Sequence, residues 1–259
     1  MTALAVEGLA ISFGGVTAVD GVGFAAEAGK VLSVIGPNGA GKTTLFNLIA
    51  GIYRPASGSV RLDGVDVTAQ PVAMRARRGL ARTFQNLQVC MNMTARENVM
   101  LGCHNRASAG LLAGILGLPA TRRGHAAAAE EAAALLRRVG LEAWVDGDPG
   151  AMPYGALKRL EIARALALRP RVLLLDEPAA GLNPTETRAM SELIDSIRGD
   201  GVAVLLVEHD MRLVMGISDR IVVLDRGRVI ADGEPAEVRR DPAVVGAYLG
   251  RGLAAAEVS

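Results

Sequence analysis

One glycine-rich loop constrains the fold of this chain more than any other segment. Residues 36–44 read GPNGAGKTT, and they lie between an almost wholly apolar run at 31–35 and a helical stretch at about 43–50. A strand, a glycine-rich loop ending in Lys-Thr and a helix, in this order, make up the phosphate-binding loop motif. The backbone N–H groups of such a loop and the N-terminus of its helix surround a phosphate. The chain is therefore predicted to be an α/β protein that binds a nucleotide through its phosphates.

Each residue of this loop is a candidate for binding ATP. Lys42 is expected to contact the β- and γ-phosphates, and the Thr43 hydroxyl is expected to bind Mg²⁺. The alternative is a glycine-rich turn without a ligand, but the lysine, the threonine, the strand and the helix all stand in the register that binding requires. The candidate nucleotide-binding residues are Gly36, Pro37, Asn38, Gly39, Ala40, Gly41, Lys42, Thr43 and Thr44.

Two further apolar runs lead to side chains suited to catalysis. Residues 172–175 are followed by Asp176 and Glu177, and His209 stands two residues beyond the run at 202–207. In open α/β sheets, ligands bind at the carboxyl ends of the strands. Asp176 is therefore expected to bind Mg²⁺, and Glu177 to act as the general base that polarises the attacking water. His209 is expected to contact the γ-phosphate. Without the phosphate loop, the same residues would be ordinary structural features of strand ends.

Gln85 and Phe13 complete the candidate site. Gln85 follows a short strand expected to end near Thr83, where the sheet gives way to helices. Its amide is expected to bind magnesium or water and to act as a hinge. Phe13 lies near the end of the first predicted strand, and its ring either stacks on a nucleotide base or packs in the core.

Composition excludes several classes of protein. The longest apolar run, at 109–120, has twelve residues, whereas a helix needs about 20 to cross a bilayer, so a soluble, cytosolic protein is expected despite 50% hydrophobic residues and a mean hydropathy of +0.29. The formal net charge of +1 indicates no broad basic surface, and nucleic acid is not expected as a partner. Cys90 and Cys103 match neither a disulfide framework nor a zinc site.

Hydrophobic patterning divides the chain into regions. Apolar stretches at 4–11 and 22–26 predict paired strands, and helix-forming sequence replaces strand-forming sequence between about 86 and 169. Asn183, followed by proline and by glutamate at the third helical position, predicts the start of a helix. A single domain is predicted over 1–252: an α/β core with a β subdomain (1–85 and 170–232), a helical subdomain (86–169) and a helical tail (233–252), followed by frayed residues 253–259.

The order of the motifs resembles the ATP-binding cassette (ABC) ATPases over essentially the whole chain. GPNGAGKTT is similar to their Walker A loop, RTFQ at 82–85 to the Q-loop, LLLDEP at 173–178 to the Walker B strand, AGLNP at 180–184 to the D-loop and EHD at 208–210 to the switch. Phe13 matches the aromatic residue that stacks on adenine. The resemblance implies a P-loop NTPase (RecA-like) core with an antiparallel β subdomain and an inserted α-helical subdomain, which hydrolyses ATP with Mg²⁺.

Within that superfamily, ARTFQN, TARENVMLG, LEIARAL and LDEPAAGLNP resemble the branched-chain amino acid transporter ATPases. This resemblance implies an importer of branched-chain or related amino acids. The implied partners are a second ABC ATPase subunit or a second copy of this chain, two transmembrane permease subunits and a periplasmic solute-binding protein. The implied location is the cytoplasmic face of the cell membrane.

One segment departs from the family pattern. The signature of this branch reads like LAYGDQ, whereas residues 152–157 here read MPYGAL. In the family the signature contacts ATP bound to the opposite subunit, which implies cross-dimer roles for Pro153, Tyr154, Gly155, Ala156 and, in the D-loop, Asn183. Pro153 has neither a hydroxyl nor a backbone N–H, and the Ala156 side chain cannot hydrogen-bond, so weaker support for the opposing site is expected. The alternative is that Pro153 starts the helix without consequence.

Two other functions use a similar loop. A soluble ABC ATPase that acts as a mechanical switch on ribosomes or DNA usually carries two cassettes or a long coiled coil, and neither is present in this sequence. A small-molecule kinase needs neither a D-loop nor a switch histidine. Glu177 as a water-polarising base favours hydrolysis over phosphoryl transfer.

Overall fold

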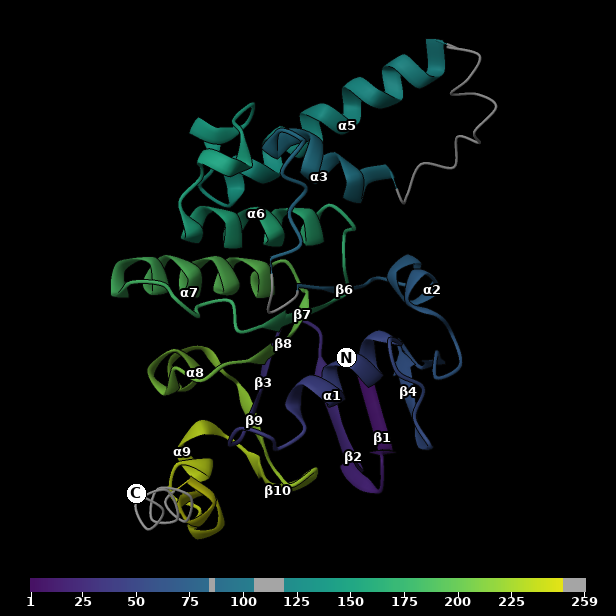
Figure 1. The fold of residues 1–259 in the computed structure, drawn as a ribbon, viewed down its shortest axis with the longest axis vertical. Helices are drawn as coiled ribbons and strands as arrows, with labels where there is room; N and C mark the ends of the chain where they lie inside the picture. Colours follow the sequence, from purple (N-terminus) through teal and green to yellow (C-terminus); the bar gives the residue numbers. More distant parts are fainter. Residues whose placement is uncertain (84–86, 105–118, 249–259) are drawn as a thin grey trace.

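A central parallel sheet organises the molecule in the computed structural model, which describes residues 1–83, 87–104 and 119–248 (Figure 1). Its six strands have the order β10-β9-β3-β8-β7-β6, and β10 alone pairs antiparallel with its neighbour. The strands are β3 (Val31–Ile35), β6 (Leu80–Arg82), β7 (Val172–Asp176), β8 (Ala203–Val207), β9 (Arg220–Asp225) and β10 (Arg228–Gly233). Every residue of β3, β7 and β8 is buried, as expected of strands covered on both faces.

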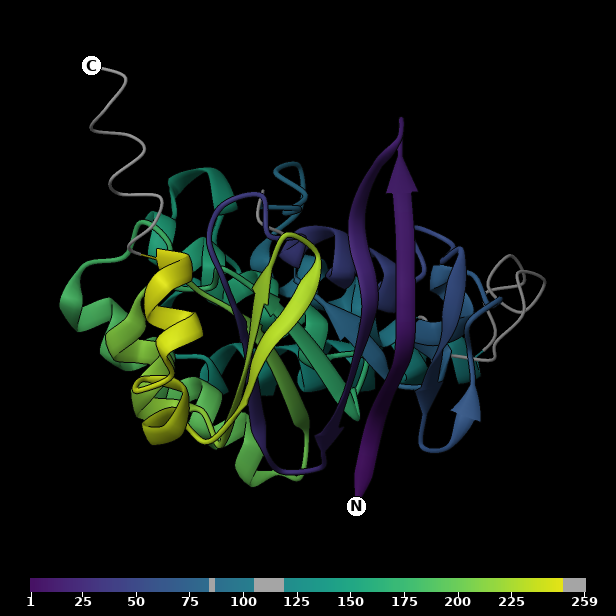
Figure 2. The ribbon, with the colours of Figure 1, turned by 90° about the horizontal axis from the view of Figure 1, so that it is seen from below.

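An antiparallel sheet packs beside this central sheet, and it confirms the predicted N-terminal strand pair. Its order is β2-β1-β4-β5, with β1 (Thr2–Phe13), β2 (Val16–Glu27), β4 (Ser57–Leu62) and β5 (Val65–Asp66). Figure 2 shows β1 and β2 as two long neighbouring ribbons. Their apolar residues alternate with exposed ones and face the core that also receives α1 (Lys42–Ala50). The antiparallel sheet and α1 thus cover one face of the central sheet.

Most of the helices cover the other face and extend beyond the edge strand β6. Along the chain they are α3 (Ala95–His104), α5 (Pro119–Arg138), the short 3₁₀ helices Glu142–Trp144 and Pro149–Ala151, α6 (Tyr154–Leu166), α7 (Pro184–Gly199), α8 (Met211–Ile217), α9 (Pro235–Val238) and a helical segment at 242–248. The short helix α2 (Val72–Arg77) lies instead beside α1 (Figure 1). In Figure 1, α3, α5 and α6 gather at one end of the molecule, whereas α7 and α8 lie beside the sheet. Among the described helices, none combines the length and the apolar composition needed to span a membrane.

The alternation of side chains along β7 explains how one sheet supports two cores. Leu173 and Leu175 belong to a cluster with the helices α3, α5, α6 and α7, whereas Val172 and Leu174 belong to a cluster with α1 and the antiparallel sheet. Successive side chains of a strand point to opposite faces. A third, smaller cluster joins Ile35, at the end of β3, to α8 and to Val244 near the C-terminus.

A buried arginine ties α2 to the end of α1. Arg75 is 1% exposed and donates hydrogen bonds to the backbone oxygens of Leu48 and Ile49, at 2.8 and 2.7 Å. It also donates to the oxygens of Thr68 and Gln70, at 2.8 and 3.0 Å. Burial lowers the pKa of Arg75. Because a guanidinium has several donors in a fixed plane, one side chain satisfies four carbonyl groups.

Replacing Arg75 is predicted to destabilise the protein strongly. The change Arg75→Met removes the charged donor that four backbone oxygens share, so we expect the free energy of unfolding to fall by about 3 kcal/mol. Chemical denaturation monitored by circular dichroism measures the loss. The matched control is Arg77→Met on the exposed side of the same helix, which should change stability little. An equally small effect of both changes would contradict the structural role of Arg75.

Candidate functional site

The phosphate loop and the ends of two central strands meet at one cleft of about 480 Å³. Loop residues from Asn38 to Thr44 line one side, and Glu177 and His209 line another. Val16, Thr17 and Ala18 of β2 and Arg226 from the β9–β10 turn complete the wall. Residues separated by more than 150 positions in the chain therefore face one space, because parallel strands bring their carboxyl ends to the same edge of a sheet.

Two glycines allow the loop to pass close to neighbouring backbone. A Cβ at Gly36 would lie 2.1 Å from the Leu224 oxygen, and one at Gly41 would lie 2.3 Å from the Ala18 oxygen. Both residues also have positive φ, 149° and 104°, where L side chains are strained. The Ala40 oxygen accepts a hydrogen bond of 2.9 Å from the Gly227 N–H. The loop is thus held between β2 and the β9–β10 turn.

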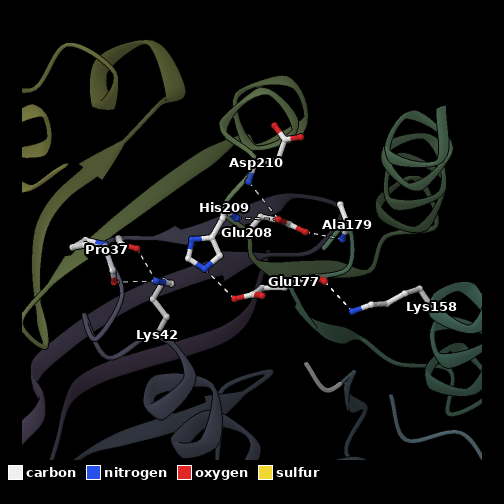
Figure 3. Close-up of polar contacts among 9 residues, drawn as sticks. Pro37, Lys42, Lys158, Glu177, Ala179, Glu208, His209 and Asp210 are labelled. Atoms are coloured by element: carbon white, nitrogen blue, oxygen red, sulfur yellow. Dashed lines mark hydrogen bonds and ion pairs between the residues drawn. The ribbon is translucent and has the colours of Figure 1, made fainter. Parts of the chain in front are cut away.

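Lys42 lies across the loop that it ends. Its Nζ donates to the backbone oxygens of Gly36, at 2.6 Å, and Pro37, at 3.1 Å (Figure 3). The residue is 7% exposed, so its charge is held close to the space that the loop encloses. Thr43, the next residue, is exposed and lines the cleft. The first turn of α1 therefore places a cation and a hydroxyl side by side.

Asp176 is buried and paired with an arginine from the neighbouring strand. Its Oδ2 accepts a hydrogen bond of 3.0 Å from Arg82 Nη2, and the two side chains are 2% and 7% exposed. The same guanidinium donates to Asn47 Oδ1 at 2.6 Å and lies 5.6 Å from the centre of the Phe46 ring, both on α1. Burial raises the pKa of Asp176, and the hydrogen bond and charge of Arg82 oppose that rise.

Glu177 and His209 form a pair at the mouth of the cleft. Glu177 Oε1 lies 2.9 Å from His209 Nε2 (Figure 3), and the side chains are 18% and 47% exposed. Glu177 has a φ of 51°, an uncommon conformation for a residue with a side chain. Such backbone strain gathers at functional sites. The arrangement places a carboxylate next to both an imidazole and the loop.

Glu208, between β8 and His209, holds the surrounding loops together. Its carboxylate accepts hydrogen bonds from the N–H groups of Ala179, at 2.7 Å, and His209, at 2.9 Å, with a longer one of 3.5 Å from Asp210 (Figure 3). It is 4% exposed. Burial raises the pKa of Glu208, and the three N–H groups oppose that rise. This carboxylate joins the segment after Glu177 to the segment that carries His209.

The signature segment lies at the N-terminus of α6. Pro153 precedes the helix with no side-chain cap, and both Pro153 and Tyr154 are exposed. Gly155 is buried against the start of α7, where a Cβ would lie 2.7 Å from Glu186 Oε1. Ala156 is 3% exposed, so its side chain faces the interior of this subunit. The cross-dimer role that the family resemblance implies for it stays a prediction.

The predicted helix start at Asn183 is confirmed. Asn183 Oδ1 accepts hydrogen bonds of 3.0 Å from the N–H groups of Thr185 and Glu186, and Glu186 Oε2 accepts one of 3.0 Å from the Asn183 N–H. Both partners of this capping box are thus satisfied. Asn183 is exposed.

Phe13 does not line the cleft: its ring is 45% exposed and meets the Tyr53 ring edge-on, with centroids 5.3 Å apart. Gln85 lies outside the described residues. Conversely, Arg226, Glu208 and Arg82 were not predicted as members of the site. The proximity of Arg226 to the loop depends on contacts between strands that are distant in the sequence.

Comparisons with known proteins agree with this geometry. A family model described as ABC transporter matches residues 19–180, and one described as branched-chain amino acid ATP-binding cassette transporter matches residues 228–254. The chain is 48% identical to the high-affinity branched-chain amino acid transport ATP-binding protein BraF of Pseudomonas aeruginosa and 44% identical to LivG, of the same description, of Escherichia coli. Each alignment covers 95% of this chain and 97% of the relative.

Solved structures show the same fold. A crystal structure of the ADP conformation of an ATP-binding cassette from an ABC transporter superposes with a TM-score of 0.83 at 30% identity, covering 96% of this chain and 99% of that one. The agreement extends over the central sheet, the antiparallel sheet and the helical region together, since nearly the whole chain is covered.

Replacing Glu208 is predicted to destabilise the site loops. The change Glu208→Gln turns one acceptor into an amide N–H₂ that faces a buried backbone N–H, so we expect the free energy of unfolding to fall by about 1–3 kcal/mol. Thermal denaturation of the wild-type protein and the variant measures this loss of stability. Glu97→Gln is the matched control, because Glu97 also accepts from a backbone N–H, that of Thr94 at 2.8 Å, but at an exposed position. Equal losses in the two variants would show that burial of Glu208 is not what matters.

Proposed function

Because this chain belongs to the ATP-binding cassette transporter family, we propose that it is the ATP-hydrolysing subunit of an importer for branched-chain or related amino acids. One observation carries the hydrolytic part of the proposal: the phosphate loop with Lys42 faces the Glu177–His209 pair across a single cleft. The amino acid substrate is supported by the described roles of the similar proteins BraF and LivG and by the match over residues 228–254.

The loop has the form that a nucleotide phosphate requires. Gly36 and Gly41 leave no room for side chains, and the N-terminus of α1 points its backbone N–H groups at the cleft. Lys42, now bonded to loop carbonyls, is close enough to exchange those acceptors for phosphate oxygens. We propose that residues 36–44 bind the phosphates of ATP and that the adenine ring lies on the surface around Phe13 and Val16.

A magnesium ion fits the oxygen ligands that the site provides. Thr43 offers a hydroxyl in the cleft and Asp176 a carboxylate at the end of β7, and hard oxygen ligands are those that Mg²⁺ prefers. When bound, the ion neutralises charge that develops on the phosphates. Gln85 is proposed as a further ligand of the ion or of water. The Arg82 contact keeps the Asp176 carboxylate oriented towards the strand end.

Hydrolysis needs a group that directs water at the γ-phosphate. Glu177 is proposed to accept a proton from that water as it attacks, because its carboxylate lies in the cleft and is only part-exposed. His209, whose Nε2 lies 2.9 Å from Glu177 Oε1, restricts the rotamers of the carboxylate and is proposed to contact the γ-phosphate. Lys42 stabilises charge on the phosphate oxygens.

The remaining parts of the proposal concern assembly. A second ABC ATPase subunit, or a second copy of this chain, would present its signature to the phosphate loop described above. Pro153, Tyr154, Gly155 and Asn183 of this chain would do the same for the partner's nucleotide. Two permease subunits and, through them, a periplasmic binding protein would complete an importer, with this subunit peripheral on the cytoplasmic face of the membrane. Nucleic acid is not proposed as a partner.

The change Glu177→Gln is predicted to separate ATP binding from hydrolysis. The amide keeps the size of the side chain but cannot accept the proton, so we expect ATP hydrolysis to fall by about 10²-fold or more while ATP still binds. Equilibrium binding of a fluorescent ATP analogue and phosphate release measure the two properties. Lys42→Ala is the complementary control, which should lose binding as well. Unchanged phosphate release by Glu177→Gln would refute the assignment of the base.

A second prediction concerns the signature segment. Pro153→Ser introduces both a hydroxyl and a backbone N–H at the exposed position before α6, and serine is a favoured helix cap. We expect ATP turnover of the assembled complex to rise several-fold, because the partner's phosphates gain donors, while ATP affinity of the isolated chain stays unchanged. Reconstituted complexes containing either variant provide the comparison. Equal turnover would mean that Pro153 starts the helix without functional consequence.

A further inference from the structure

A buried ammonium connects the signature helix to the backbone of Glu177. Lys158, in the second turn of α6, is 3% exposed, and its Nζ donates a hydrogen bond of 3.1 Å to the Glu177 backbone oxygen (Figure 3). Removing a charged amine from water is costly unless it finds strong partners. A well-packed apolar side chain would fill the same space at less cost in stability. The charge at this position therefore calls for an explanation beyond packing.

The peptide that Lys158 holds is the strained one. Glu177 has a φ of 51°, which costs a residue with a side chain about 1–2 kcal/mol. Its N–H donates to the Val207 oxygen at 2.9 Å, and its oxygen accepts from the Ala180 N–H at 3.2 Å as well as from Lys158. Strand β8, the D-loop and α6 thus each contribute one contact to a single residue. These contacts fix the direction in which the carboxylate leaves the backbone.

The other side of Lys158 faces the exposed end of α6. Its Nζ lies 5.6 Å from the centre of the Tyr154 ring, one helical turn earlier, within the range of a cation–π contact. Tyr154 is 46% exposed and lies in the signature segment. Its ring also packs against the D-loop, where a Cβ at Gly181 would lie 3.1 Å from Tyr154 Cε1. A continuous chain of contacts runs from the surface at Tyr154 to Glu177 and on to His209.

We propose that Lys158 is a positioning residue that transmits the state of the signature surface to the carboxylate of Glu177. Contact of the opposing subunit's nucleotide with Tyr154 would shift the ring, and with it the ammonium that holds the Glu177 peptide. The general base Glu177 in this chain's own ATP site would then be aligned only when the opposing subunit's ATP site is occupied. The inference rests on the proposed function, since it requires Glu177 to be the base and the signature to meet a second nucleotide.

The variants Lys158→Met and Lys158→Arg test the role of the charge. Methionine keeps much of the length and apolar stem of lysine but donates no hydrogen bond, so we expect kcat for ATP hydrolysis by the full-length chain in its assembled complex to fall about 10- to 100-fold. KM and the equilibrium affinity for ATP should stay unchanged, because the phosphate loop is untouched. Arginine keeps the charge and should retain most of the activity. Lys30→Met, at an exposed lysine paired with Asp219, is the matched control and should change nothing.

A double variant keeps the test independent of folding effects at Lys158. Tyr154→Leu alters an exposed ring, so it is expected to fold, and it should lower kcat of the assembled complex without changing the ATP affinity of the isolated chain, whose own phosphate loop is untouched. Combined with Lys158→Met it should lower kcat no further, since both changes interrupt one path. Losses that multiply in the double variant, or wild-type kcat in Lys158→Met, would overturn the proposal. A parallel loss of ATP affinity or of thermal stability in Lys158→Met that accounts for the fall in kcat would overturn it as well.

The Glu177→Gln variant separates this inference from the proposed function. If Glu177→Gln abolishes hydrolysis but Lys158→Met does not slow it, the positioning role of Lys158 is refuted and the hydrolytic function stands. If Glu177→Gln leaves hydrolysis intact, the assignment of the base fails, and the role of Lys158 fails with it.

Discussion

The phosphate loop passes very close to the backbone carbonyl groups of two other strands, and this close approach determines how the rest of the structure is arranged. At Gly36 the loop meets the end of β9, and at Gly41 it meets β2 of the antiparallel sheet. Only residues without a side chain can make both approaches. The two sheets are therefore joined through the loop itself, and α1 begins at a point that three separate strands define. These contacts of the loop with β9 and β2 thereby determine the positions of Lys42 and Thr43.

A different principle organises the opposite wall of the cleft. There the functional side chains follow parallel strands and sit in short loops, which polar groups from distant elements hold in place: Glu208 for the loops after β7 and β8, Lys158 for Glu177, and Arg82 for Asp176. Each of these groups is buried and charged. Buried charged hydrogen bonds tolerate little change in geometry. Small movements of α6 or β6 are therefore felt directly at the carboxylates.

Local sequence was enough to predict the elements that carry the chemistry. The loop, the strands before Asp176 and His209 and the capping box at Asn183 are each specified within a few neighbouring residues, and all of these elements appear in the structure. The helix α2 and the partners of Arg75 were not predicted, because an arginine-rich segment resembles an exposed one until its four carbonyl acceptors come from elsewhere. The roles of Arg82, Glu208 and Lys158 were not predicted for the same reason: their partners come from distant parts of the chain. The inward direction of Ala156 depends on how α6 packs against its neighbours, which a motif alone does not specify.

The cluster of hydrogen bonds around Arg75 has a mechanical consequence for α1. The guanidinium grips the last carbonyls of this helix together with the oxygens of Thr68 and Gln70 after β5, while Gly41 anchors its first turn to β2. Both ends of α1 are thus fastened to the segment that contains the antiparallel sheet. Sliding the helix along its axis would break contacts at each end. The phosphate loop therefore leads into a helix that is fixed at both ends, and we expect it to move less during nucleotide binding and release than the segments across the cleft.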